Sequence, residues 1–536
     1  MQRLLLMPFL LCLLANATLR AQPLTSSPLP IVLIETGGQD IDFQKIEADL
    51  KIIDNPSGQL NHPGDPPAYE GLISIRLRGN YSAWLPQKPY AFETLDAATG
   101  LDTSVSLLDM PKEEDWILLA TWNDKSFMRN AMMFHLARSM GQWAPHTRHV
   151  EVMLDGVYAG VYVFCEKIKR DGDRVDIAKL SPADNALPEV SGGYIFKHDY
   201  GWDFVTDNWH PQNCSDRWLN FEMVYPKIEE VTPAQLDYLR GYLDEAEEAL
   251  FSPGFADPGT GYRQYLDVPS WVDYFLLGEL SGNVDAYKKS MFFHKDRDSL
   301  LKMGPIWDFD WALKFLGENG FPNGSGWLYN IDPCTQDVLY VPYFQRMMKD
   351  SFYQQKVCDR WQTLRNGVLD TLSIFAYVDS TALALDEAQA RHFQRWHCLG
   401  YDSGAPETPP YPTTYAGEVE KLKKFLRQRI AWMDGNLPLV ACQMPVTEPP
   451  AGSEWSLEVL PNVGSGEFVV QVSGIPTAGV SAALFDARGS HCALLPLKNG
   501  DNLLALKDFP TGAYFLQIRE KGKRLVRRVV VNGAGK

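Results

Sequence analysis

Two aspartates stand two positions apart in an apolar and aromatic run, PIWDFDW, at residues 305–311. In an extended segment, side chains two positions apart point the same way, so Asp308 and Asp310 would share one face. Like charges in apolar surroundings need a cation, and carboxylate oxygens suit Mg²⁺ or Mn²⁺, with Ca²⁺ as a further option. The alternative is a pair of turn carboxylates that cap backbone groups.

A third aspartate, Asp285, follows an apolar stretch at residues 269–280 whose pattern predicts a helix. By itself, this position is that of an ordinary loop at a helix end. The common phosphate-loop, nucleophile-elbow and HExxH zinc signatures do not occur in the chain. His392 and His397 are five positions apart and do not share a helix face, so we expect structural roles for both.

Glu166 and Lys88 form a candidate ion pair. Each has aromatic residues two and four positions away on its own predicted strand, so each is expected to point into a packed face. A buried carboxylate needs a partner, and a Lys–Glu pair can hold the lysine toward nucleotide phosphates. The alternative is a surface salt bridge that contributes little.

These residues must be positioned by a mixed set of strands and helices. An Asp-Gly pair at 155–156 lies between β-rich arms and predicts a hairpin with a type I′ turn. Apolar periodicity and turn residues predict the remaining elements. We expect strands at 31–35, 72–78, 90–93, 149–154 and 157–168, a buried strand and turn at 301–311, and helices at 124–141, 232–250, 269–280, within 343–375, and at 419–433.

The character of the chain changes after residues 443–454 (QMPVTEPPAGSE), which form the best linker candidate. Beyond it, short β-rich runs are separated by turn residues, as in a small β-sandwich. The expected strands cover 455–460, 467–472, 480–485, 513–519 and 525–531.

Residues 1–21 have the pattern of a signal peptide, with Arg3, an apolar run at 4–14, and small residues at Ala15, Ala17 and Ala21. The alternative is a cytosolic protein with an apolar first helix. No later stretch reaches about 18 apolar residues, so we expect no transmembrane anchor.

The chain has 536 residues and a formal net charge of −17. Its length allows more than one core. An acidic surface repels phosphates, so we expect no nucleic acid partner. The eight cysteines include no CxxC pair, which gives no support to the common zinc spacings.

Taken in order, these segments resemble the CotH (spore coat protein H) kinase family over about residues 30–440. The family looks like a remote relative of the protein kinases. The segments that carry the resemblance are LRGN at 77–80 with PQK at 86–88, DWIL at 115–118, DK at 124–125 with MRN at 128–130, DG at 155–156 with GVY at 160–162 and EKI at 166–168, GGYI at 192–195, NVD at 283–285 and WDFD at 307–310.

The resemblance implies a role for each candidate residue. Asp285 would be the catalytic aspartate that orients or deprotonates the acceptor hydroxyl, and Asp308 would bind the metal that bridges the phosphates of ATP. Lys88 would contact those phosphates with Glu166 positioning it, while Gly193 and Tyr194 would lie near the nucleotide edge.

Two positions depart from the family pattern. Many kinase-like catalytic loops have Asn five residues after the catalytic aspartate, where this chain has Ser290. A serine is a shorter and weaker metal ligand, and Asp310 could supply the lost ligand. Tyr81 replaces a small polar residue in the loop on the phosphate side.

The C-terminal segment, residues 455–536, resembles the sorting domain of the type IX secretion system. LPN at 460–462, LFDARG at 484–489 and PTGAYF at 510–515, followed by a basic last strand, keep the family order. The resemblance implies export through the periplasm to the cell surface, with this domain recognised by a translocon and then removed. The alternative is an ordinary Ig-like accessory domain.

The sequence therefore predicts an α+β protein: an atypical protein-kinase-like domain followed by a small all-β Ig-like sandwich. Its predicted function is ATP- and metal-dependent phosphoryl transfer to an unidentified acceptor, most simply a protein, outside the cytoplasm. One alternative is a catalytically weak or inactive surface interaction protein that keeps the fold, which Ser290 favours. Another is a structural protein in which Asp308 and Asp310 hold a stabilising cation.

Overall fold

A computed structural model of the chain describes residues 24–206, 219–316, 324–330, 340–405 and 407–437, and of the C-terminal part residues 456–460, 463–464, 467–474, 480–486, 491–507, 509–510, 512–520 and 523–531. The predicted signal peptide and the predicted linker lie outside these residues. Within them, no helix combines the length and the apolar character needed to cross a bilayer.

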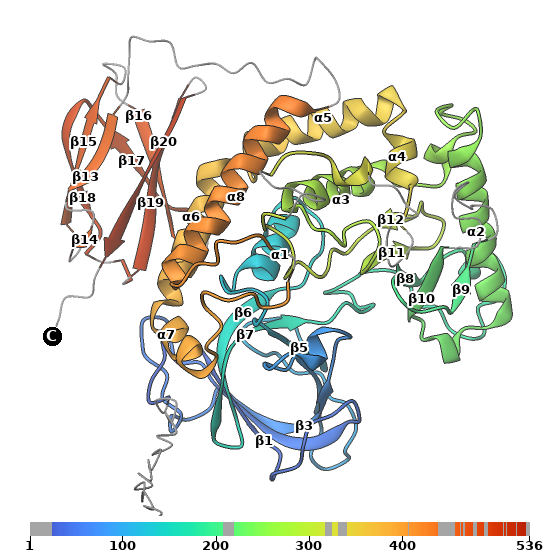
Figure 1. Cartoon of the computed structure of the whole chain (residues 1–536), viewed down its shortest axis with the longest axis horizontal. Helices are drawn as coiled ribbons and strands as arrows, with labels where there is room; N and C mark the ends of the chain where they lie inside the picture. The colour runs from blue at the N-terminus through green and yellow to red at the C-terminus, as the bar shows by residue number, and fades with distance from the viewer. Residues whose placement is uncertain are drawn as a thin grey trace, which may run out of the picture.

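Seven N-terminal strands close into a barrel in the order β1-β2-β3-β4-β5-β7-β6, drawn in blue and blue-green in Figure 1. Its closure comes from parallel pairing of β1 with β6, whereas the other pairs are antiparallel. Alternate residues such as Ile75, Phe92, Trp116 and Phe164 fill the interior. The strands are β1 (Ile31–Glu35), β2 (Ile46–Ile53), β3 (Tyr69–Leu77), β4 (Tyr90–Leu95), β5 (Asp115–Ala120), β6 (Thr147–Leu154) and β7 (Val157–Glu166).

The hairpin between β6 and β7 is confirmed. Asp155 and Gly156 form its two-residue turn with φ of 46° and 71°. Positive φ at both central residues is the signature of a type I′ turn, whose twist matches that of the flanking strands.

Helix α1 (Arg129–Ser139) packs against the outer face of the barrel, sharing a core with Ile117, Val161 and Val163. It begins five residues later than the sequence predicted. The reason lies in Asp124, whose carboxylate accepts hydrogen bonds from the backbone N–H groups of Ser126 (3.1 Å) and Arg129 (2.7 Å). The side chain thereby stabilises a turn that precedes the helix.

A second sheet has the order β12-β11-β8-β10-β9. β8 pairs antiparallel with β11, and His198 lies opposite Met291. By continuation of this register, the next residues outward, Asp199 and Ser290, face each other just beyond the sheet. The strands are β8 (Tyr194–His198), β9 (Phe204–Val205), β10 (Asn220–Tyr225), β11 (Met291–Lys295) and β12 (Lys302–Met303).

Most of the remaining helices lie above the barrel in Figure 1, whereas α7 lies beside it, next to β7, and they include both helices predicted at 232–250 and 269–280. α3 is buried along nearly its whole length, so it is apolar on every side except at Asp273 and Glu279, which pair with Arg360 and Arg429. The helices are α2 (Pro233–Phe251), α3 (Val268–Ser281), α4 (Tyr343–Met347), α5 (Ser351–Arg365), α6 (Thr371–Ala384), α7 (Asp386–Arg395) and α8 (Tyr415–Asn436), with short 3-10 helices at Ser82–Trp84, Glu189–Ser191, Ile228–Glu230, Tyr262–Gln264 and Leu328–Asn330.

The buried strand and turn predicted over 301–311 are found only in part. Only β12 is a strand, and the chain from Gly304 to Phe309 is irregular. Asp308 has a φ of 68°, in the left-handed region, so simple strand alternation does not govern this segment.

The C-terminal part is all β, as predicted, and its two sheets share a core that includes Leu457, Val470, Leu484 and Leu516. The sequence missed β17 and β18, where Pro496 and Gly500 interrupt the strand pattern, and the two-residue β14. One sheet contains β13 (Ser456–Leu460), β15 (Glu467–Ser473) and β18 (Gly500–Ala505); the other contains β14 (Val463–Gly464), β20 (Lys523–Val531), β19 (Gly512–Glu520), β16 (Val480–Asp486) and β17 (His491–Leu497).

Candidate active site

The loop that carries Asp285 starts where α3 ends at Gly282, whose φ of 58° lies in the left-handed region. The next side chain, Asn283, makes two contacts. Its Nδ2 donates to the backbone carbonyl of Asp308 (2.9 Å), and its Oδ1 accepts from the backbone N–H of Asp285 (3.1 Å). One amide therefore holds the Asp285 loop and the Asp308 loop together.

Helix α1 fixes the other side of the Asp308 loop. The Oδ1 of Asn130 accepts from the backbone N–H of Phe309 at 2.8 Å. The ring of Phe134 stacks on Trp307 with 5.4 Å between centroids. These contacts lie immediately before and after Asp308, so its unusual backbone conformation is held from both sides.

Asp285, Asp308 and Asp310, which we call the buried carboxylate site, influence one another electrostatically. Burial is the largest cause that raises the pKa of Asp308 well above its usual value, and the charges of Asp310 and Asp285 raise it further. A guanidinium, that of Arg78, acts in the opposite direction. The structure thus brings together the three aspartates that the sequence singled out.

Arg78 is the cation of the barrel that faces this site. It follows directly on β3, and its guanidinium lies over the Trp307 ring at 5.3 Å. Among the described residues, neither Asp308 nor Asp310 has an ion-pair partner within 4.0 Å. Asp285 does, because the ammonium groups of Lys288 and Lys289 lie 3.5 and 3.9 Å from its Oδ1.

Ser290 also lies at the site, as the sequence predicted. Its hydroxyl is 3.4 Å from Oδ2 of Asp308 and 3.5 Å from Oδ2 of Asp199. The contact with Asp199 follows from the pairing of β8 with β11 described above.

The predicted pair of Lys88 and Glu166 does not form. Strand register places Lys88 level with Tyr162, four residues along β7 from Glu166, a separation of about 13 Å. The Lys88 ammonium donates to the backbone carbonyl of Ala83 (2.9 Å). Glu166 is fully buried and accepts from the backbone N–H of His146 (2.8 Å) and lies 2.9 Å from its ring. Matching strand parity was correct for both residues, but parity alone does not give their level in the barrel.

Gly193 and Tyr194 belong to the packed start of β8. Gly193 has a φ of 97°, and an added Cβ would lie 2.8 Å from the carbonyl oxygen of Ala178. The Tyr194 side chain is fully buried, and its hydroxyl donates to the Val190 carbonyl at 2.8 Å. Five extended residues, about 16 Å, separate Tyr194 from Asp199 at the buried carboxylate site.

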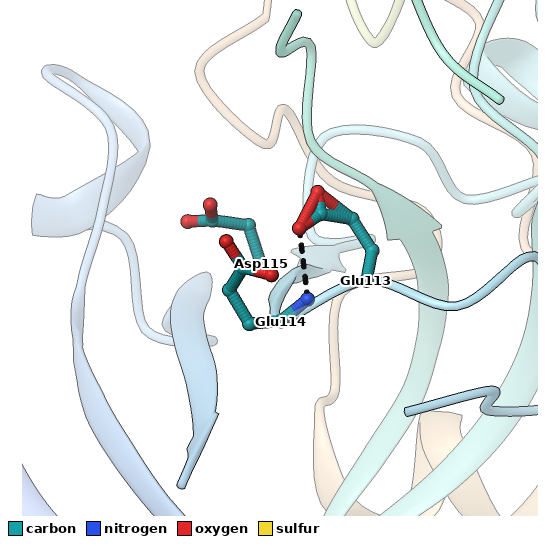
Figure 2. A group of neighbouring side chains, drawn as sticks. All are labelled: Glu113, Glu114 and Asp115. Carbon is teal, nitrogen blue, oxygen red and sulfur yellow. Dashed lines mark hydrogen bonds between the residues drawn. The ribbon is translucent and has the colours of Figure 1, made fainter. Parts of the chain in front are cut away.

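A second group of carboxylates, Glu113, Glu114 and Asp115, has ligand atoms within 4.8 Å of one another, the only such group of three among the described residues. Figure 2 shows these three side chains, which we call the barrel-end cluster, and the hydrogen bond from the Glu114 backbone to Glu113 (2.9 Å). The ammonium of Lys169 contacts all three carboxylates. Lys167 lies 2.6 Å from Asp115 and Arg174 lies 3.7 Å from Glu113, so three cations of the chain balance the three acids.

Arg78 and Asp199 are residues at the site that sequence reasoning did not assign. Arg78 stands at the end of a predicted strand, where alternation with Ile75 and Leu77 already places it on the outer face. Asp199 gives no local signal, since its place depends on pairing with a strand some 90 residues later in the chain.

Comparison with known proteins gives one strong result. The profile of the protein family described as CotH kinase protein matches residues 75–433, about two thirds of the chain. No curated protein matches the chain.

Among solved structures, the crystal structure of a Helicobacter pylori proinflammatory kinase, CtkA, is similar over 73% of this chain and 94% of that chain, at 11% identity and a TM-score of 0.25. A TM-score of that size carries no inference about this chain.

Proposed function

Because the chain belongs to the CotH kinase protein family, we propose that it is an exported kinase that transfers a phosphoryl group from ATP to an acceptor hydroxyl, most simply on a protein. The observation that carries the proposal is the convergence of Asp285, Asp308, Asp310 and Ser290 from separate loops with Arg78 from the barrel. Phosphoryl transfer needs such positioned charges more than it needs covalent chemistry.

The donor set fits a hard divalent cation, Mg²⁺ or Mn²⁺, with Ca²⁺ as a further option. Asp308 and Asp310 offer carboxylate oxygens that the chain does not neutralise by an ion pair among its described residues, and Ser290 adds a hydroxyl. A cation bound there would neutralise charge on the phosphates of ATP. Burial is the main cause of the raised pKa of Asp308, and the charges of Asp310 and Asp285 add to it.

The chain's own cations complete the arrangement. We infer that Arg78, rather than Lys88, contacts the phosphates, since Arg78 faces Asp308 and Asp310 while Lys88 points to the carbonyl of Ala83. A guanidinium also suits phosphate oxygens because it donates in a fixed fork. Asp285 would accept the proton of the acceptor hydroxyl, with Lys288 and Lys289 beside it.

We assign supporting roles to Glu166, Gly193 and Tyr194. The Glu166 carboxylate accepts a hydrogen bond from the backbone N–H of His146 and so stabilises this end of the barrel. The start of β8 at Gly193 and Tyr194 sets the position of the strand that leads to Asp199 and to the proposed nucleotide edge.

We further propose that the C-terminal part is a type IX sorting domain with an Ig-like sandwich fold, recognised by the translocon. Its independent core of two sheets supports a separate unit. A disulfide at Cys358 supports an oxidising compartment and therefore export.

A second candidate function is partner binding without efficient catalysis, because Ser290 stands where kinase-like loops often have Asn. A protein with a weakened metal site would bind partners at the cell surface through the same fold without efficient transfer. In that case the change Asp285→Ala would leave its cellular phenotype intact.

Incubation with γ-labelled ATP and Mg²⁺ or Mn²⁺ separates the two functions. Wild type, Asp285→Ala and Asp308→Ala are compared, and mass spectrometry then locates any modified residue, self-modification included. The kinase proposal expects label in the wild type and a loss of label in both variants. Absence of nucleotide binding by the wild type with either metal would overturn it.

A further inference from the structure

Asp199 lies at the point where the second sheet meets the loop of Asp285. It directly follows β8, and Ser290 directly precedes β11. Antiparallel register sets His198 opposite Met291, so the next pair outward is Asp199 and Ser290. The strand pairing ends at His198 and Met291, and just beyond it two residues about 90 positions apart are in contact, with Ser290 Oγ 3.5 Å from Oδ2 of Asp199.

The Ser290 hydroxyl lies between two carboxylates. Its Oγ is 3.4 Å from Oδ2 of Asp308 and 3.5 Å from Oδ2 of Asp199. Serine is a shorter and weaker ligand than the Asn of many kinase-like loops, and Oδ2 of Asp199 lies beside its hydroxyl.

We propose that Asp199 is a ligand of the divalent cation that binds with the nucleotide, in the place left by the short side chain of Ser290. The inference rests on the proposed function. It assigns to Asp199, which directly follows β8, the metal contact that Asn makes in many kinase-like loops.

The surroundings of Asp199 permit this role. Its Oδ1 accepts from the backbone N–H of Tyr200 (3.0 Å), which fixes the carboxylate and leaves Oδ2 toward Ser290. Oδ2 also contacts the ammonium of Lys197 at 2.9 Å. Lys197 has a second carboxylate, Glu222, at 2.9 Å, so it stays neutralised when Oδ2 turns to a cation.

Glu222 provides a matched control. The change Glu222→Gln removes a carboxylate from the same lysine but not the contact with Ser290. The change Ser290→Asn provides a rescue, because Ser290 has a φ of 51° and Asn tolerates the left-handed region better than most residues. An amide there would restore a ligand within the catalytic loop.

The test measures Mn²⁺ affinity of the full chain by electron paramagnetic resonance, with a non-hydrolysable ATP analogue present at saturation. We expect Asp199→Asn to weaken Mn²⁺ binding by about tenfold or more, since loss of a carboxylate ligand lowers both charge and ligand number. Glu222→Gln leaves Lys197 with Asp199 as its carboxylate partner, so a small loss of about threefold is expected, well short of that in Asp199→Asn. The double change Asp199→Asn with Ser290→Asn should recover most of the lost affinity.

Two results would overturn the assignment while leaving the kinase proposal in place. One is an unchanged Mn²⁺ affinity in Asp199→Asn alongside a loss in Asp308→Asn. The other is an equal loss in Asp199→Asn and Glu222→Gln, which would mean that Asp199 acts only through Lys197. A wild-type chain that binds no Mn²⁺ with the nucleotide analogue overturns both proposals. Thermal unfolding of each metal-free variant checks that the fold is kept.

Discussion

Two groups of three carboxylates in this protein differ in how the chain balances their charge. The barrel-end cluster has three adjacent acids, and the buried carboxylate site has three acids from two loops. At the barrel end, Lys169 contacts all three, and Lys167 adds a contact to Asp115 at 2.6 Å. At the buried site, Asp308 and Asp310 lack an ion-pair partner within 4.0 Å among the described residues.

We infer from this difference that proximity of carboxylates alone does not mark a metal site. The barrel-end cluster is the tighter of the two, yet its charge is balanced by side chains of the same barrel. At the buried site, burial and two neighbouring carboxylates raise the pKa of Asp308, so its ionised form costs stability in the free protein. We infer that a bound cation, rather than a lysine, compensates this cost.

The largest expected effect comes from Asp285→Asn. Removal of the proton acceptor should lower the rate of phosphoryl transfer by about a thousandfold, within the range of general base catalysis. Binding of the Mn²⁺–nucleotide complex should change by less than about threefold. Asp115→Asn at the barrel end is the control and should leave the transfer rate close to wild type.

Single-turnover assays measure the transfer rate, and calorimetric titration of the same preparations measures binding of the Mn²⁺–nucleotide complex. Transfer that survives in Asp285→Asn would remove that residue from the chemistry.

A smaller effect is expected from Arg78→Met. Loss of a charge-assisted hydrogen bond to phosphate should weaken nucleotide binding by about tenfold to a hundredfold. Lys88→Met should have less effect, since its ammonium is engaged with the carbonyl of Ala83. Equilibrium binding of a fluorescent ATP analogue to both variants decides between them, and a larger loss in Lys88→Met would reverse the assignment.

Lys169→Met makes the barrel-end cluster resemble the buried site. Three carboxylates would lose their shared cation, which should lower the free energy of unfolding by about 1–2 kcal/mol after allowance for the partial exposure of Lys169. Addition of Mn²⁺ should restore part of this loss at the new uncompensated cluster. Urea denaturation with and without Mn²⁺ measures both quantities, and a variant as stable as wild type would show that Lys169 does not balance the cluster.

The smallest effect concerns Glu113. Burial raises its pKa to about 7, above the 4.5 of the unfolded chain. Between these values the folded state binds the proton more tightly, so this residue makes stability fall as pH rises from 4.5 to 7. Glu113→Gln should remove that contribution, at most about 1.4 kcal/mol per pH unit. Denaturation curves across this range test it, with Glu47→Gln, exposed on β2, as control.

The local parts of the site could be predicted from the sequence, and the long-range parts could not. Asp285, Asp308 and Ser290 lie near elements or motifs that are visible in short windows. The reason given for pairing Asp308 with Asp310 was wrong, because a left-handed residue rather than strand alternation shapes that turn.

The predicted ion pair between Lys88 and Glu166 failed for a different reason. Parity placed Lys88 and Glu166 on the interior of the barrel, but only the register of β4, β5 and β7 shows that they lie at different levels. Asp199 likewise depends on the register of β8 with β11. Register is set by tertiary packing, and a single sequence does not reveal it.

The most direct test compares one acid from each group. Calorimetric titration with Mn²⁺ in the presence of an ATP analogue is carried out on wild type, Asp308→Asn and Asp115→Asn. The account predicts that Asp308→Asn abolishes measurable Mn²⁺-dependent nucleotide binding and that Asp115→Asn retains wild-type affinity. Retained binding in Asp308→Asn, or its loss in a folded Asp115→Asn protein, would contradict it.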